Sequence, residues 1–317
     1  MPPSDPSRPT DTHERDEGAE RAPASGAFLP GTIHSRRFLA TTVLPAVCAL
    51  IVVVTVALAP GEQRAPILWS SLVAAASGFA ATSIGVYGGV LVPGLLLLGI
   101  DARFVAAASL FLQVLVIPLG ASAHARLGNI ARHVAIPLIV GGVVGAFVGP
   151  ACAAALPKES TARIVAGVIV LVGLLVLATL RFGGMAKPAR LEDVSRSRIG
   201  AVGLVAGFAS GVSGAGWGPI GVKCLLLLGI EPRQAIGSSL LGRVFMALSA
   251  VVGYLCSANA LEAVRVEAWL LVPLFAGSLS TMVPGVFLVS RMQRERAVVL
   301  ITLLSIALAL PTLIRGQ

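Results

Sequence analysis

Long apolar stretches constrain this chain more than any other feature of its sequence. About 20 consecutive apolar residues suffice to cross the hydrocarbon core of a bilayer, and nine stretches here approach or exceed that length. Of the 317 residues, 56% are hydrophobic and only 12% are charged, which is more apolar surface than one water-soluble core can bury. The sequence therefore predicts an all-α polytopic membrane protein. The stretches are Phe38–Ala59, Ile67–Gly99, Ala102–Ala123, Val134–Leu156, Ile164–Leu180, Ile199–Leu228, Ala235–Cys256, Trp269–Val289 and Ala297–Ile314.

The two halves of the chain resemble each other. The triplet that begins at Gly78 recurs at Gly207, 129 residues later, and the run Leu95–Ile100 recurs as Leu225–Ile230, 130 residues later. An acidic residue and then an arginine follow each run. We expect two repeats, each with one Gly-broken segment and three transmembrane helices, and one extra N-terminal helix at Phe38–Ala59.

The loop charges distinguish two topologies for the broken segments, which either cross the membrane once or re-enter on the same side. With Arg36 and Arg37 placed inside, the re-entrant topology puts eleven Lys and Arg residues inside and six outside, whereas single crossings give seven and ten. Basic residues concentrate in cytoplasmic loops. The charges therefore favour re-entrant segments, inverted-topology repeats and a cytoplasmic N-terminus in the cell (inner or plasma) membrane.

Composition divides the chain further. Residues 1–34 are rich in Pro, Asp, Glu, Arg, Ser and Thr, which predicts a disordered cytoplasmic tail. Residues 35–66 form the extra transmembrane helix and its loop, 67–181 the first repeat, 182–198 a basic cytoplasmic linker, and 199–317 the second repeat.

The breaks in the two repeats are the first candidate for a functional site. Both Ser83–Gly89 and Gly211–Pro219 are rich in glycine, and each glycine destabilises a helix by about 1 kcal/mol relative to alanine. In lipid, the exposed backbone groups need partners from protein or a wet cavity. A half-helix that starts after a break directs its N–H groups at that cavity, where they can bind an anion. The alternative is that the glycines only permit close helix crossings.

Two cations lie deep in apolar stretches. Arg243 aligns with Gln113 of the first half, and Lys223 follows the second break. No carboxylate is equally deep, so a bound anion would serve as their counter-ion. Alternatively, Lys223 extends to the membrane surface and Arg243 caps the carbonyls of a broken helix. The candidate substrate-binding residues are Gly85, Tyr87, Gly88, Gly89, Gln113, Ser213, Gly214, Gly216, Trp217, Lys223 and Arg243.

A duplicated Gly-rich break followed by a half-helix and a Leu run resembles the sulfite exporter TauE/SafE family of the toluene-sulfonate uptake permease type. The resemblance covers about residues 67–314; Tyr87 and Trp217 interrupt the usual glycine runs, and Lys223 aligns with Pro93. The family implies secondary transport of a small sulfur-containing anion such as sulfite, sulfoacetate or an organosulfonate. An anion channel and a transporter of a small carboxylate are the alternatives. The matching residues are Gly85, Gly88, Gly89, Pro93, Gly211, Gly214, Gly216 and Gly218.

The distribution of charge and the motifs that the sequence lacks argue against several other functions. The net charge of +9 is spread over short loops and not over one polar face, which argues against nucleic acid as a partner. The sequence has no HExxH, GxSxG or P-loop pattern, and its four cysteines lack metal-ligand spacing, so we expect neither an enzyme nor a bound metal or cofactor. The expected partners are a small inorganic or organic anion, the lipid bilayer and a coupling ion, H⁺ or Na⁺; the oligomeric state stays open.

The predicted topology can be tested by labelling. In a cysteine-free background, a cysteine introduced at Ser195 should react with a membrane-impermeant maleimide only after the membrane is opened. Labelling of that position in intact cells would contradict the cytoplasmic linker.

Overall fold

The chain is α-helical throughout the part that the structure describes. This computed structural model describes residues 42–84, 87–182, 194–289 and 294–315, and these contain no β-strand. The predicted tail at 1–34, most of the linker and Gly85 lie outside them. The elements are α2 (Leu44–Leu58), α3 (Gly61–Ile84), α4 (Gly88–Leu97), α5 (Ala102–Arg126), α6 (Arg132–Ala155), α7 (Lys158–Phe182), α8 (Arg196–Ser213), η3 (Gly218–Val222), α9 (Lys223–Leu227), α10 (Pro232–Cys256), α11 (Ala258–Glu267), η4 (Ala268–Leu270), α12 (Leu271–Val289) and α13 (Arg294–Arg315).

Several of the expected membrane-spanning helices are present. Within the described residues, five helical stretches are long and apolar enough to cross a bilayer, and shorter apolar helices accompany them. Large apolar side chains cover the outer surface, for example Leu50 at 61% and Leu171 at 68% exposure, as a lipid solvent allows. The prediction of an all-α polytopic membrane protein is confirmed. The five stretches are Arg132–Ala155, Lys158–Ala178, Pro232–Cys256, Ala258–Met282 and Val298–Arg315.

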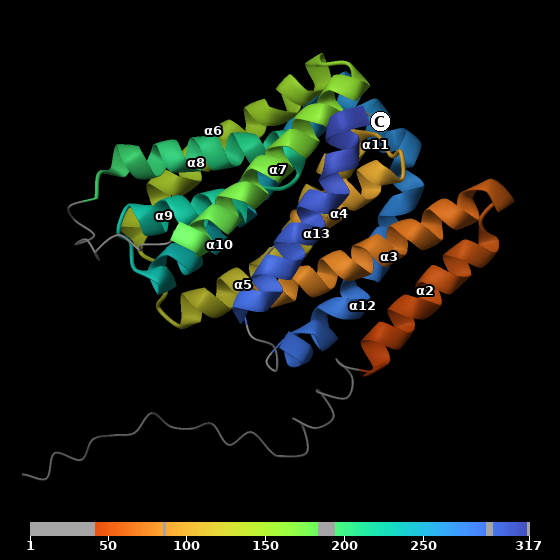
Figure 1. Cartoon of the computed structure of the whole chain (residues 1–317), viewed down its shortest axis with the longest axis horizontal. Helices are drawn as coiled ribbons and strands as arrows, with labels where there is room; N and C mark the ends of the chain where they lie inside the picture. Colours follow the sequence, from red (N-terminus) through yellow and green to blue (C-terminus); the bar gives the residue numbers. More distant parts are fainter. Residues whose placement is uncertain (1–41, 85–86, 183–193, 290–293, 316–317) are drawn as a thin grey trace, which may run out of the picture.

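Both broken segments fold back along themselves. After α3 ends, α4 runs beside it, so that a Cβ added at Gly94 would lie 2.5 Å from the side chain of Val73. After α8 ends, η3 and α9 return in the same way, and Gly221 lies beside Ala206. Figure 1 shows the short α9 returning toward the end of the molecule where α8 starts. Each break is therefore the tip of a helical hairpin.

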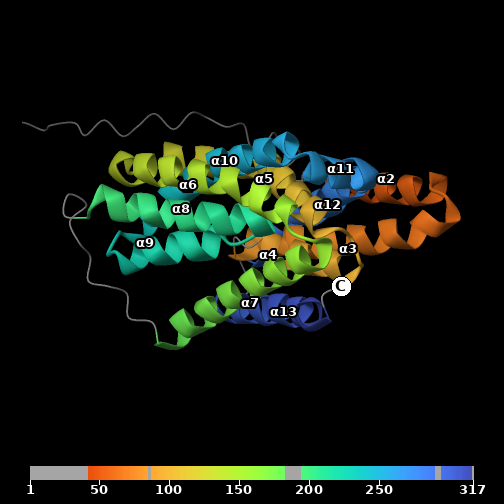
Figure 2. The same cartoon turned by 90° about the horizontal axis from the view of Figure 1, so that it is seen from above.

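A glycine-lined contact between α6 and α8 positions the second hairpin. A Cβ at Gly145 would lie 2.1 Å from the carbonyl oxygen of Leu204, and one at Gly207 would lie 2.3 Å from that of Gly142. The two backbones thus touch with no room for side chains, which is the packing that small residues allow in membranes. Figures 1 and 2 show α6 and α8 side by side.

The helices α7 and α13 form a separate pair against the two hairpins. Figure 2 shows them lying together along one side of the molecule, and α13 also packs on α4. Their contact is made by apolar and small side chains, with Gly173 facing Ile306 and Gly167 facing Leu313. This pair closes the space into which both breaks open.

Two features depart from the sequence expectation. The helix α11 was not expected, because residues 258–267 carry Glu262, Arg265 and Glu267 and form no apolar stretch. The half-helix after the second break begins as one turn of π-helix, η3, before it becomes the α-helix α9. A π turn often accompanies local irregularity at functional sites.

Asp101, just before α5, forms an ion pair with the buried Arg103 of α5 and another with the exposed Lys158 at the start of α7. Asp101 accepts hydrogen bonds from the backbone N–H of Arg103 at 2.9 Å and from its guanidinium at 3.1 Å, and Lys158 Nζ lies 3.4 Å away. Burial opposes ionisation of Asp101, but the bonds and charge of Arg103 and the charge of Lys158 outweigh it, so its pKa lies below the ordinary value. The carboxylate of Asp101 therefore both pairs with Arg103 and caps the start of α5.

This pair predicts a pH-dependent stability. A carboxyl group whose pKa is lowered by folding stabilises the protein above its ordinary pKa of 3.8 and loses that contribution as the pH falls below it. Asp101→Asn should lower the free energy of unfolding by roughly 1–3 kcal/mol at pH 7, because Arg103 stays buried without its partner. Thermal unfolding of the purified protein should show this difference shrinking below pH 3.8. Glu62→Gln, at an exposed acid, is the control; an equal effect there would contradict the assignment.

Candidate functional site

The two breaks meet in the interior of the protein. A Cβ added at Gly88, the first residue of α4, would lie 2.4 Å from the carbonyl oxygen of Gly214 and 3.0 Å from Cα of Ala215. Segments more than a hundred residues apart in sequence are therefore in backbone contact. The absence of a side chain at Gly88 is what permits this approach.

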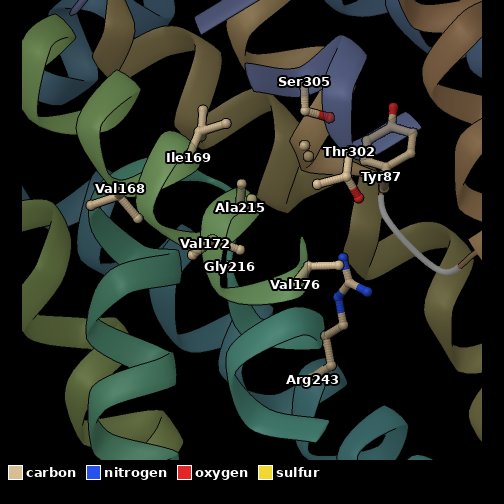
Figure 3. Close-up of a pocket in the computed structure, with 13 residues that line it drawn as sticks. Tyr87, Val168, Ile169, Val172, Val176, Ala215, Gly216, Arg243, Thr302 and Ser305 are labelled. Atoms are coloured by element: carbon tan, nitrogen blue, oxygen red, sulfur yellow. The ribbon is translucent and has the colours of Figure 1, made fainter. Parts of the chain in front are cut away.

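A small cavity lies beside this contact. Measured as the space open to the centre of a water molecule, its volume is about 40 Å³, which by that measure accommodates roughly three waters. The breaks, α7, α10 and α13 all contribute to its wall (Figure 3). The lining residues are Tyr87, Gly88, Gly89, Val168, Ile169, Val172, Gly173, Val176, Ala215, Gly216, Arg243, Thr302 and Ser305.

The cation of the cavity is Arg243, which extends into it from α10 (Figure 3). Arg243 is only 8% exposed, and its Nε donates a hydrogen bond of 2.8 Å to Oε1 of Gln113. The amide nitrogen of Gln113 in turn donates to the Gly214 carbonyl and to Ser109 Oγ, each at 3.1 Å. The two residues that the repeat aligns are thus in direct contact, and Gln113 links the arginine to the second break.

The rest of the wall is apolar or carries neutral polar groups. None of the described residues that line the cavity is acidic. The hydroxyl of Tyr87 is hydrogen-bonded to Ser278 at 2.6 Å, and that of Ser305 donates to the Ile301 carbonyl at 2.8 Å. The N-terminus of the ten-residue helix α4 adds the positive end of a helix dipole. A cation and a helix N-terminus without an acid favour an anion as the occupant.

Serine side chains accept hydrogen bonds from backbone N–H groups at the second break. Gly214 ends α8 with a left-handed φ of 67°, and Gly216 has φ of 111°, conformations that favour glycine. Ser213 Oγ accepts a bond from the N–H of Ala215, and Ser210 Oγ accepts one from the N–H of Trp217. The turn is therefore held in one conformation although no helix continues through it.

Trp217 and Lys223 are among the candidates that do not line the cavity. Trp217 is buried, donates its indole N–H to the Ser239 carbonyl at 3.0 Å, and packs between Gly142 and Gly242. Lys223 begins α9 and is partly exposed. Trp217 thus packs beside glycines on two helices, and its indole N–H already has a protein partner.

Apart from Gly85, which lies outside the described residues, the other candidates lie in or next to the cavity. Tyr87, Gly88, Gly89, Gly216 and Arg243 line it. Gln113, Ser213 and Gly214 form the layer behind, through the hydrogen bonds given above. Their part in binding a substrate stays a prediction.

The contributions of α7 and α13 were missed. Val172, Val176, Thr302 and Ser305 line the cavity, and none was singled out from the sequence. The spacing of Thr302 and Ser305 puts both on one face of an otherwise apolar helix, which is a signal that sequence reasoning could have used. The valines carry no such signal, because they match every other apolar residue of α7.

Comparisons with known proteins identify similar chains. The family model described as sulfite exporter TauE/SafE matches residues 24–174 and residues 70–311. A probable membrane transporter protein, YtnM of Bacillus subtilis (strain 168), is 32% identical over 180 residues, which is 55% of this chain and 59% of that protein. A second, YdhB of the same organism, is 30% identical over 142 residues, 43% of this chain and 56% of its own. The aligned part thus spans a little over half of each relative. No solved structure matches the chain.

The contact between the breaks predicts that adding one methyl group at Gly88 destabilises the protein. Gly88→Ala should force the breaks apart, because the new Cβ would meet the backbone of Gly214, and should cost about 1–3 kcal/mol of stability. Thermal unfolding of the purified protein measures this change. Gly167→Ala on α7 is the matched control, since its Cβ would lie at an ordinary 3.6 Å from Leu313. Equal melting temperatures for the two variants would show that the close contact is absent.

Proposed function

The chain belongs to the sulfite exporter TauE/SafE family, and on that premise we propose that it is a secondary transporter of a small sulfur-containing anion. The single observation that carries the proposal is Arg243 within a cavity between two glycine breaks, lined by no described acid. Such a site attracts a negative charge and offers it directional donors. An intramembrane site of this kind has no group that points to catalysis, and we propose transport in place of an enzymatic role.

The size of the cavity limits which anions fit in it. About 40 Å³ suits an anion of a few non-hydrogen atoms, such as sulfite, in this conformation. A sulfoacetate or an organosulfonate needs a wider space, which α7 and α13 would provide by moving apart. Sulfite-sized anions are therefore the first choice, and larger sulfonates the second.

The binding mode follows from the contacts of Arg243. Its Nε is held by Gln113, so the guanidinium keeps its orientation when the cavity holds no anion. The positive charge of this guanidinium lies at the cavity wall, where it would attract an anion, and its planar shape suits an oxyanion. Gly88 and Gly89, which begin α4, also line the cavity. An anion bound by Arg243 and by the N–H groups of these glycines would link the two hairpins through one substrate.

We further propose that the hairpins are re-entrant segments of two inverted-topology repeats. The fold-back of α4 on α3 and of α9 on α8 supports this arrangement, as does the Arg243–Gln113 contact between residues that the repeat aligns. Alternating access would then open the cavity to one side at a time. A cytoplasmic N-terminus in the cell membrane and coupling to H⁺ or Na⁺ belong to the same proposal.

A binding screen of the purified protein tests the substrate class. Sulfite should raise the melting temperature in a saturable manner, with sulfate, thiosulfate, sulfoacetate, taurine and acetate as competitors. Arg243→Gln should weaken sulfite binding by roughly tenfold to a hundredfold, because it removes a charge-assisted hydrogen bond. Arg233→Gln, at an exposed arginine of the same helix, is the control. Unchanged affinity in Arg243→Gln would remove this residue from the site.

A second variant separates charge from packing. Gln113→Glu sets a carboxylate against Arg243, which should neutralise the cavity and abolish binding. Because this change also removes the amide donor to the Gly214 carbonyl, a cooperative thermal unfolding transition of the variant must accompany the binding measurement. Flux into proteoliposomes then distinguishes the mechanisms: saturation and counterflow indicate a carrier, and their absence a channel. Preferential binding of acetate over every sulfur anion would overturn the substrate class.

A further inference from the structure

A second and larger hollow lies between α6 and α8, at the end of the molecule where both helices begin. Its volume, on the measure used above, is about 530 Å³, and it shares no lining residue with the central cavity. It extends from Arg132 and Arg196 at the helix starts to Val140 and Gly200 further along. It is therefore a groove with a charged end and an apolar end.

The charged end is built from both helices. Arg132 begins α6 and Arg196 begins α8, and both are exposed. His133 contacts Arg196: its Nδ1 accepts a hydrogen bond of 3.4 Å from Nε of Arg196. Its other ring nitrogen, Nε2, is hydrogen-bonded to the Val194 carbonyl at 3.0 Å. None of the described residues of the groove is acidic. Two arginines thus converge where no described protein group neutralises them within the groove.

The apolar end has the character of a surface made for a hydrocarbon chain. Ile136 and Val140, one turn apart on α6, are each 60% exposed. The floor beside them is bare backbone, because a Cβ at Gly141 would lie 2.0 Å from the carbonyl oxygen of Gly200. From Arg132 to Val140 the helix rises by about 12 Å. A soluble ion would use the charged end alone and leave this length of groove unused.

We propose that this groove binds an anionic phospholipid. The phosphate would lie between Arg132 and Arg196, and one acyl chain would follow Ile136 and Val140 over the glycine floor. Arginine pairs of this kind recognise phosphate oxygens, and basic pockets between transmembrane helices select anionic headgroups. The lipid would hold α6 against α8, the helix that leads to the second break. The inference needs only that the protein lies in a bilayer, and is independent of which anion it carries.

The test uses the full-length protein in a neutral detergent. Phosphatidylglycerol should raise its melting temperature in a saturable manner, whereas phosphatidylcholine and inorganic phosphate should not. The double variant Arg132→Gln, Arg196→Gln should bind phosphatidylglycerol about thirtyfold more weakly, at about 1 kcal/mol for each basic residue near the surface. The control, Arg163→Gln with Arg265→Gln, removes the same charge from two exposed positions elsewhere and should bind normally.

A third variant tests the acyl-chain part of the groove without changing its charge. Val140→Trp should fill the apolar end and weaken phosphatidylglycerol binding, and because Val140 is exposed the fold should tolerate it. Equal stabilisation by phosphatidylcholine, or full affinity in the double variant, would overturn the proposal. If inorganic phosphate competes for the site and Val140→Trp binds normally, the groove is a free-anion site and the lipid assignment is wrong. Sulfite binding at the central cavity should stay unchanged in all three variants, which separates this result from the proposed transport.

Discussion

The structure depends on how a broken helix satisfies its backbone where water is scarce. In a bilayer every N–H and C=O group without a partner costs several kcal/mol, so a break survives only where the protein supplies the partners. At the second break this is done by side chains from another helix: Ser109 donates to the Gly214 carbonyl at 2.8 Å and Gln113 does so at 3.1 Å. The same amide holds Arg243. One small network therefore both permits the break and orients the charge beside it.

The sequence predicted the features that depend on composition and repetition. The apolar stretches gave the all-α membrane class, and the alignment of the halves put Gln113 opposite Arg243, which are hydrogen-bonded in the structure. It could not predict which side chains of α7 face the cavity, because an apolar helix in lipid has no polar side that marks its outer surface. On α13 only the spacing of Thr302 and Ser305 carried such a mark. Nor could the sequence place Trp217, since a large residue beside glycines fits a cavity wall and a packing anchor equally well.

The helices around the cavity differ in how tightly they pack. The pair α6 and α8 is in backbone contact along a row of glycines, which leaves little freedom to slide. The pair α7 and α13 meets through aliphatic side chains, whose rotamers can adjust. A substrate that needs a wider cavity would move the second pair more easily than the first. The first pair carries the glycine turn at the end of α8, and the second pair carries the valines and hydroxyls of the cavity wall.

Trp217 has a consequence for how the sequence of such a protein can vary. Its ring fills the space between two helices at Gly142 and Gly242, where an added Cβ would lie 2.6 Å and 2.9 Å from ring atoms. The three residues thus share one volume, and none can grow unless another shrinks. A chain with a smaller residue at position 217 would need bulk at 142 or 242 to keep the turn at the second break in place. Substitutions at these positions are therefore tied together, although they lie on three separate elements.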